Sequence, residues 1–166
     1  MSIKIGVLTG GGDCPGLNAV VRSVVKTAIH DYSMEVVGFM DGYEGLIENR
    51  HRDLDDKAVS GILTRGGTIL GTSNKANPFE FPILENDKWI YIDRSSQVVR
   101  NYERLGLDAL IAIGGDGTMA ATHGLMNLGL KAVGIPKTID NDLYGTDQTF
   151  GFDSALQTAT DAVDKI

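Results

Sequence analysis

The stretch ALIAIGGDGT at positions 109–118 decides the fold of this chain. Five apolar residues without a helical period predict a strand buried on both faces, as in a parallel sheet. Three glycines and Asp116 then follow within positions 114–117, and glycine permits both a sharp turn and the close approach of a ligand. A helix over Met119–Met126 should follow, with Thr118 as its N-cap.

A strand, a glycine turn and a helix N-terminus in succession predict a phosphate-binding turn, because the first helical amides have no intrahelical acceptor. Asp116 would repel phosphate unless a cation lay between them, which suggests Mg²⁺ held largely through water and phosphate oxygens. The alternative is a plain strand–helix connection with a capping carboxylate. Three glycines in four positions exceed what a cap requires, so the phosphate interpretation is favoured.

The composition is that of an ordinary globular chain, with 166 residues, 42% hydrophobic residues and a mean hydropathy of −0.04. This length suits one domain with a real core. The net charge of −7 argues against nucleic acid or an anionic membrane as a partner, since both need a basic face. A lone cysteine, Cys14, excludes an internal disulfide. With no signal peptide and no long apolar run, we expect a soluble cytoplasmic protein.

Strand patterns and helix patterns alternate along the chain. This alternation predicts an α/β fold with a doubly wound, Rossmann-like, largely parallel sheet flanked by helices. Positions 72–93 are expected to form an irregular surface excursion or lid. The further expected strands are Ile3–Thr9, Glu35–Met40 and Lys131–Ile135, with a short extended piece at Thr68–Gly71. A further helix is expected to start at Leu17, and three more are expected over Leu54–Leu63, Arg94–Leu105 and Asp153–Ile166. Loops are expected at Asp41–Leu46 and Pro136–Phe150.

Ligands of open α/β sheets bind beyond the carboxyl ends of the strands. Three loops leave such ends, Gly10–Asn18, Gly114–Thr118 and Pro136–Asp142, and we expect them to meet. In the first loop, the amide of Gly11 is the best candidate to touch a transferring phosphoryl group. A dinucleotide fingerprint is less favoured, because Pro15 stands where its third glycine belongs.

The third loop carries the chemistry expected of a phosphoryl acceptor site. Asp140 and Asp142 flank one residue, so one carboxylate can accept a hydroxyl proton while the other binds or orients a cation. Thr138 can donate to a phosphate or sugar oxygen, and Lys137 supplies positive charge. The alternative is a solvated Asp–Asn turn, which is common for such residues.

With these loops in view, the chain resembles the amino-terminal part of the 6-phosphofructokinases over essentially its whole length. The combination of PKTIDND with GGDGT in this order is highly specific. The matching motifs are IGVLTGGGDCPGLN (5–18), DGYEGL (41–46), RGGTILGTS (65–73), IGGDGT (113–118), PKTIDND (136–142) and GTDQTFGFDSAL (145–156).

The resemblance implies a glycolytic kinase that transfers a phosphoryl group from MgATP to the 1-hydroxyl of fructose 6-phosphate, in a homo-oligomeric and allosteric enzyme. Asp140 would be the proton acceptor, with Thr138 and Ile139 along the sugar phosphate. Asp116 would hold Mg²⁺. The donor-phosphate contacts implied by the match are Gly11, Gly115, Asp116, Gly117 and Thr118.

The phosphoryl donor depends on two positions of the family pattern. Gly117 is typical of ATP-dependent members, because a larger acidic residue there would exclude the α-phosphate of the nucleotide. Lys137 is typical of pyrophosphate-dependent members, and we expect ATP on the strength of Gly117. The family usually places arginine where Asn74 stands, so Lys75 is the candidate to replace it as a less directional charge.

Complete members of the family run to roughly twice this length. We therefore expect positions 1–166 to be the donor-binding domain, with 139–166 starting a second, sugar-phosphate domain, and the chain alone to be inactive. Few arginines lie near the three loops, which agrees with that expectation. Two alternatives stay open: a non-catalytic nucleotide- or phosphate-binding module, and another GGDG kinase acting on NAD or a lipid.

Overall fold

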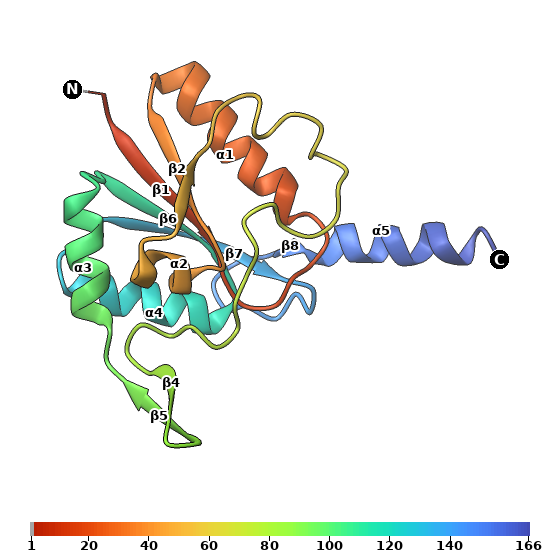
Figure 1. Cartoon of the computed structure of the whole chain (residues 1–166). Helices are drawn as coiled ribbons and strands as arrows, with labels where there is room; N and C mark the ends of the chain where they lie inside the picture. Colours follow the sequence, from red (N-terminus) through yellow and green to blue (C-terminus); the bar gives the residue numbers. More distant parts are fainter. Residues whose placement is uncertain (1) are drawn as a thin grey trace.

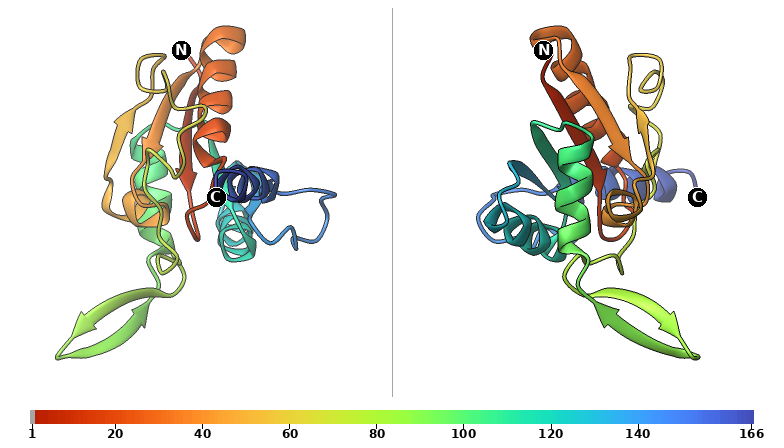
Figure 2. Two further views of the ribbon diagram at one scale, coloured as in Figure 1. Left: turned by 90° about the vertical axis from the view of Figure 1, so that its right-hand side faces the viewer. Right: turned by 60° about the vertical axis from the view of Figure 1, so that its left-hand side comes forward.

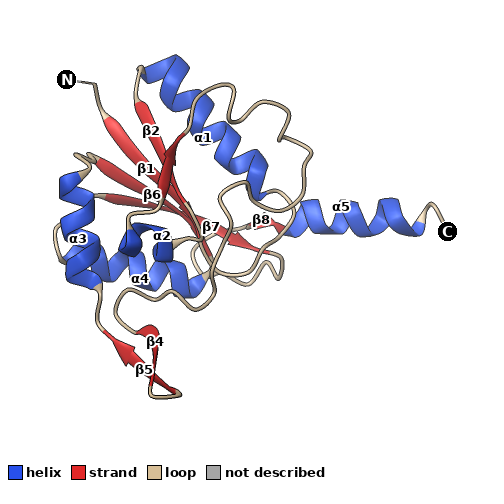
Figure 3. Cartoon of the chain, in the orientation of Figure 1, coloured by secondary structure: helices blue, strands red, loops and turns tan. Residues whose placement is uncertain are grey.

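The computed structural model describes residues 2–166, in which eight strands and five helices form (Figure 3). The strands are β1 (Lys4–Thr9), β2 (Glu35–Phe39), β3 (His51–Asp53), β4 (Phe81–Glu85), β5 (Lys88–Ile92), β6 (Ala109–Gly114), β7 (Ala132–Thr138) and β8 (Phe150–Gly151). The helices are α1 (Leu17–Tyr32), α2 (Tyr43–Glu48), α3 (Ser95–Arg104), α4 (Asp116–Asn127) and α5 (Phe152–Val163).

Six strands form the main sheet in the order β3-β2-β1-β6-β7-β8 (Figure 1). Every pair in it is parallel except β2 with the short edge strand β3. From β1 the chain moves outward to β2, and from β6 it moves outward in the opposite direction to β7. The strand order therefore reverses between β1 and β6, which is where open α/β sheets bind their ligands. The expected doubly wound fold is confirmed.

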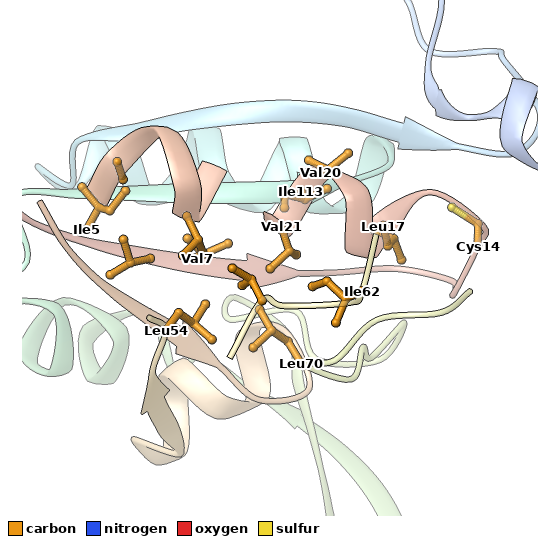
Figure 4. Close-up of a cluster of buried hydrophobic side chains, with 14 residues drawn as sticks. Ile5, Val7, Cys14, Leu17, Val20, Val21, Leu54, Ile62, Leu70 and Ile113 are labelled. Carbon is orange, nitrogen blue, oxygen red and sulfur yellow. The ribbon is translucent and has the colours of Figure 1, made fainter. Parts of the chain in front are cut away.

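Apolar side chains alternate between the two faces of the sheet and are covered on each. Val7 packs in a cluster with the buried stripe of α1, as Figure 4 shows. Its neighbour Leu8 belongs to a second cluster, built with α2, α3 and α4 on the opposite face. Both side chains are fully buried, as expected for a central parallel strand.

Two expectations for residues 41–63 are wrong. The helix expected over Leu54–Leu63 is a series of turns, whose buried Leu54, Val59 and Ile62 pack in the cluster with α1. Conversely, part of the expected loop at Asp41–Leu46 forms the short helix α2. The short strand β3 was not expected either.

The segment expected to be irregular between Thr72 and Asp93 contains the hairpin β4–β5, which projects beyond the sheet in both views of Figure 2. Trp89 in β5 is 64% exposed. The expected extended piece at Thr68–Gly71 is a turn. Strand β7 continues to Thr138, so it takes up the start of the expected loop after Ile135.

Helix α5 forms close to its expected bounds, but its apolar residues are not buried. No residue of α5 is buried, and Leu156 is 56% exposed. Figure 1 shows the helix pointing away from the sheet, so its apolar face lacks a surface to pack against. Within residues 2–166, no helix combines the length and the hydropathy needed to cross a bilayer.

Candidate active site

The three glycine- and aspartate-rich loops meet where the strand order reverses. The amide of Gly10 donates to the carbonyl of Ile113 over 2.8 Å, which ties the end of β1 to β6. Gly11 has a φ of 78°, and a Cβ built on it would lie 4.0 Å from the Gly115 nitrogen. The same Cβ would lie 3.6 Å from the Nζ of Lys137. One residue from each loop is thus in contact range of the other two.

Helix α4 begins earlier than the sequence suggested, at Asp116, with Gly115 as its N-cap residue. The first helical bond runs from the Met119 amide to the Gly115 carbonyl over 2.9 Å. The amides of Asp116, Gly117 and Thr118 therefore have no intrahelical acceptor, and the positive end of the helix dipole lies at the same point. This arrangement suits an anion.

The prediction that Thr118 is the N-cap is wrong, and the reason is steric. Its side chain is buried between the ends of two strands instead. A Cβ on Gly10 would lie 2.6 Å from the Thr118 Oγ1, and a Cβ on Gly114 would lie 2.4 Å from it. Both glycines are thus required so that Thr118 can anchor the start of α4 against β1 and β6.

A cavity of about 260 Å³ opens beside this helix N-terminus. Its volume is slightly below the usual range for small-molecule sites, so it can enclose a polyphosphate rather than a whole nucleotide. A Cβ on Gly117 would meet nothing within 4 Å, which leaves that wall of the cavity open. The lining residues from the predicted site are Gly11, Asn74, Gly115, Gly117 and Thr118.

The free amide expected at Gly11 is already engaged. It donates to the carbonyl of Ser73 over 3.1 Å, and the Thr72 hydroxyl donates to the Gly11 carbonyl over 2.7 Å. The first loop is therefore held closed by the segment that carries Asn74 and Lys75, both of them exposed. A phosphate contacting the Gly11 amide would have to displace Ser73.

Lys137 is buried, with 4% of its surface exposed. Its ammonium donates to the carbonyl of Gly10 over 3.4 Å and to the carbonyl of Gly12. Within the described part of the chain, its ammonium forms no salt bridge with a carboxylate. A buried cation held only by carbonyls leaves its charge uncompensated, so this position favours a bound anion.

The PKTIDND loop is braced by its own hydrogen bonds. The hydroxyl of Thr138 accepts from the Asp140 amide over 3.1 Å, and the Thr149 hydroxyl donates to the Thr138 carbonyl over 2.9 Å. The Thr149 amide donates to the side chain of Asn141 over 2.9 Å. Ile139, Asp140 and Asp142 are exposed, so both carboxylates are accessible to a ligand.

Asp116 places an exposed carboxylate in the first turn of α4. Among residues 2–166, no group of three or more His, Cys, Asp or Glu side chains is arranged to hold a metal. Mg²⁺ bound with a substrate phosphate needs only one or two protein carboxylates, because phosphate and water oxygens complete its shell. The single carboxylate of Asp116 fits that mode.

Two residues beside the cavity were missed. Tyr43 of α2 lines it, and its hydroxyl lies 2.6 Å from the hydroxyl of Thr122 in α4. Burial raises the pKa of Tyr43 to about 12. In the sequence, Tyr43 stood out only as part of the matching motif DGYEGL, and that match indicated no role for it.

A larger cavity of about 830 Å³ lies on the other face of the sheet, between α1 and β7. Its lining is mainly apolar, and none of the predicted site residues contributes to it. The predicted donor-site residues that line a cavity therefore lie at the smaller one, whereas Lys137, Thr138 and Asp140 line neither of the two.

A family model described as Phosphofructokinase matches residues 4–166. ATP-dependent 6-phosphofructokinase 2 of Clostridium perfringens is 52% identical over 164 residues, which cover 98% of this chain and 45% of that protein. The protein of the same name from Streptomyces coelicolor is 53% identical over 165 residues, covering 99% and 45% respectively. The chain thus spans about half the length of these curated relatives.

Solved structures show the same likeness. Phosphofructokinase of Pichia pastoris in the T-state matches with a TM-score of 0.84 at 31% identity, covering 99% of this chain and 18% of that one. Pyrophosphate-dependent phosphofructokinase of Marinobacter aquaeolei matches with a TM-score of 0.73 at 19% identity, covering 96% and 41%. The second match is a likeness of fold alone, so the fold does not decide the donor.

Proposed function

Because this chain belongs to the phosphofructokinase family, we propose that it forms the donor-binding part of an ATP-dependent 6-phosphofructokinase. The terminal phosphoryl group of MgATP would pass to the 1-hydroxyl of fructose 6-phosphate. The observation that carries the proposal is the convergence of Gly11, Gly115 and Lys137, which joins a glycine turn, a helix N-terminus and a buried ammonium.

The donor phosphates would lie against the amides of residues 116–118, where the helix dipole favours negative charge. Lys137 would supply the compensating charge from beneath the first loop. Asp116 would hold Mg²⁺, and the bound ion would neutralise charge on the donor phosphates. Asn74 and Lys75, at the rim, would contact the outer part of the donor.

Asp140 would act as the general base. Its carboxylate would take the proton of the 1-hydroxyl while that oxygen attacks the terminal phosphorus and the bond to the leaving ADP breaks. The Thr138 hydroxyl, bonded to the Asp140 amide, fixes the start of this loop. Thr138 and Ile139 would contact the sugar phosphate, and Asp142 would orient a cation or the base.

The donor is ATP because the space beside Gly117 is open and can receive the α-phosphate of a nucleotide. Pyrophosphate is the second candidate. The specific observation in its favour is the buried Lys137, whose charge lies close to Gly11 and would suit a small dense anion.

Residues 139–166 would begin a second domain that completes the sugar-phosphate site. The lack of any buried residue on α5 supports this assignment, because its apolar face has no surface to cover it here. The arginines that a sugar phosphate requires would come from the rest of the protein and from a neighbouring subunit of a homo-oligomer.

Steady-state assays of the intact protein test this proposal, with fructose 6-phosphate and either MgATP or magnesium pyrophosphate. We expect turnover with MgATP, and a loss of kcat of about 10²- to 10⁴-fold in Asp140→Asn, in line with removal of a general base. Binding of MgATP in calorimetry without turnover on either donor would favour a non-catalytic nucleotide-binding module instead.

A further inference from the structure

We propose that Tyr43 is a positioning residue of the donor site, which fixes the N-terminal turns of α4 through Thr122. The inference rests on the proposed function, since it concerns how the amides that would bind the donor phosphates are held. Tyr43 belongs to α2 and Thr122 to α4, so the bond joins two elements that are separated by 79 positions in sequence.

The two hydroxyls and the Thr118 carbonyl form one buried hydrogen-bonded cluster. The Thr122 hydroxyl lies 2.6 Å from the Thr118 carbonyl and can donate to it. The Tyr43 and Thr122 hydroxyls lie 2.6 Å apart, and either can donate to the other. Tyr43 also lies 3.5 Å from the same Thr118 carbonyl. The phenol thus reaches the first turn of α4 through one buried hydroxyl.

Tyr43 lines the cavity, but only 4% of its surface is exposed, so most of its contacts are with the protein itself. Its ring packs in the cluster with Leu8, Phe39 and Leu46. A side chain so deeply buried contributes to a neighbouring cavity by holding the wall in place. The wall in question is the first turn of α4.

That turn has two separate attachments. On one side, the side chain of Thr118 is held between the glycines that end β1 and β6. On the other side, the Thr118 carbonyl is held by Thr122 and Tyr43. The rest of α4 is held separately by its buried Ala121 and Leu125. Loss of the second attachment therefore loosens the first turn, which shifts the amides of Gly117 and Thr118 relative to the donor.

A purely structural role would give a different result from positioning. If Tyr43 only adds stability, its loss lowers the melting temperature but leaves donor affinity in the folded protein unchanged. Positioning instead predicts a rise in the KM for the donor with little change in the KM for the sugar phosphate, because the sugar loop is held by Thr149 and β8.

The experiment compares Tyr43→Phe, Thr122→Val, their double variant and Thr122→Ser in the intact protein. We expect the first two variants to raise the donor KM about three- to tenfold. This change corresponds to part of the free energy that one buried hydrogen bond contributes. The double variant should be no worse than either single one, because both break the same bond. Thr122→Ser keeps the hydroxyl and should restore the wild-type donor KM within about twofold.

Asn101→Leu is the matched control. Asn101 is buried and donates to the carbonyls of Leu46 and Ile47, at the other end of α2. Its loss should lower stability while the donor KM stays unchanged. An equal rise in donor KM in this control, or additive effects of the Tyr43 and Thr122 variants, would overturn the inference.

Failure of the proposed function is distinguishable from failure of this inference. If the wild-type protein turns over neither donor, the proposed function fails. The Kd values of MgATP and magnesium pyrophosphate, measured by calorimetry on the same variants, then replace the donor KM. Unchanged donor KM or Kd in Thr122→Val overturns the inference even where turnover is normal. If Tyr43→Phe does not fold, the Thr122→Val and Thr122→Ser pair decides.

Discussion

Replacing Gly117 with aspartate should separate donor binding from stability. Gly117 is the second residue of α4 and lines the cavity, and a Cβ there meets nothing within 4 Å. The first atom of the new side chain therefore displaces no neighbour. A carboxylate in the first turn of a helix contributes about 0.3–1 kcal/mol to stability. We expect the melting temperature of Gly117→Asp to stay the same or to rise.

The same carboxylate should oppose a nucleotide. A negative charge about 4 Å from a phosphate, at the effective dielectric constant of about 20 that suits sites near a surface, costs about 4 kcal/mol. Position 117 is exposed, so solvent screening reduces this to about 2 kcal/mol. The predicted loss in kcat/KM for MgATP is thus about 30- to 1,000-fold.

The assay measures kcat/KM for MgATP and for magnesium pyrophosphate in the intact protein, with thermal melts alongside. Pyrophosphate should lose less, because it has no α-phosphate to place beside residue 117. Gly117→Asn is the control, since asparagine has almost the shape of aspartate without the charge. A kcat/KM for MgATP within about threefold of wild type in Gly117→Asp, or an equal fall in Gly117→Asn, would refute the electrostatic argument.

Three further outcomes are expected. Lys137→Met should weaken both donors at least about tenfold in calorimetry, because a charge-assisted contact is lost; unchanged affinities would mean that the ammonium only braces the first loop. Burial raises the pKa of Tyr43 from 10.0 to about 12, so the stability that depends on its neutral phenol is fully present below pH 10. About 3 kcal/mol of that stability is lost as the pH rises through 12. Denaturant titrations at these pH values should show that loss, and Tyr43→Phe should lack it. Gly38→Ala puts a Cβ 2.5 Å from the Leu70 Cδ2, so it should cost about 1–3 kcal/mol in the same titrations, with donor affinity of the folded protein unaffected.

The parts of the fold that were predictable are those with a strong local pattern. Residues Ala109–Ile113 have the apolar run of a buried parallel strand, and they form the start of β6. The stripe that begins at Leu17 has the period of a helix, and α1 buries it. In both segments the local preference agrees with the packing, so pattern alone was sufficient.

The wrong expectations arose where packing between distant segments overrides local preference. Thr118 has the chemistry of an N-cap, but its side chain is needed between Gly10 and Gly114. Leu54–Leu63 has apolar residues at intervals that suggest a helix, but the segment forms turns in which Leu54, Val59 and Ile62 are still buried in the core. On α5 the helix itself was predictable, but burial of its apolar face depends on a surface that these residues do not supply.

The candidate site was predictable as three loops but not as a set of contacts. Their convergence follows from strand order, since the carboxyl ends of β1, β6 and β7 share one edge of the sheet. The engagement of the Gly11 amide by Ser73 and the bond from Tyr43 to Thr122 are contacts between distant segments. The spacing of residues in the sequence predicts neither contact.

A crystal structure of the intact protein with a non-hydrolysable MgATP analogue tests directly whether the three converging loops form the donor site. We predict phosphate oxygens within hydrogen-bond distance of the Gly117 and Thr118 amides, with the Asp116 carboxylate facing the metal. The phosphates should also lie on the side of the first loop that Lys137 supports. A nucleotide whose phosphates lie elsewhere, for example in the groove between α1 and β7, would contradict the assignment of this edge of the sheet as the donor site.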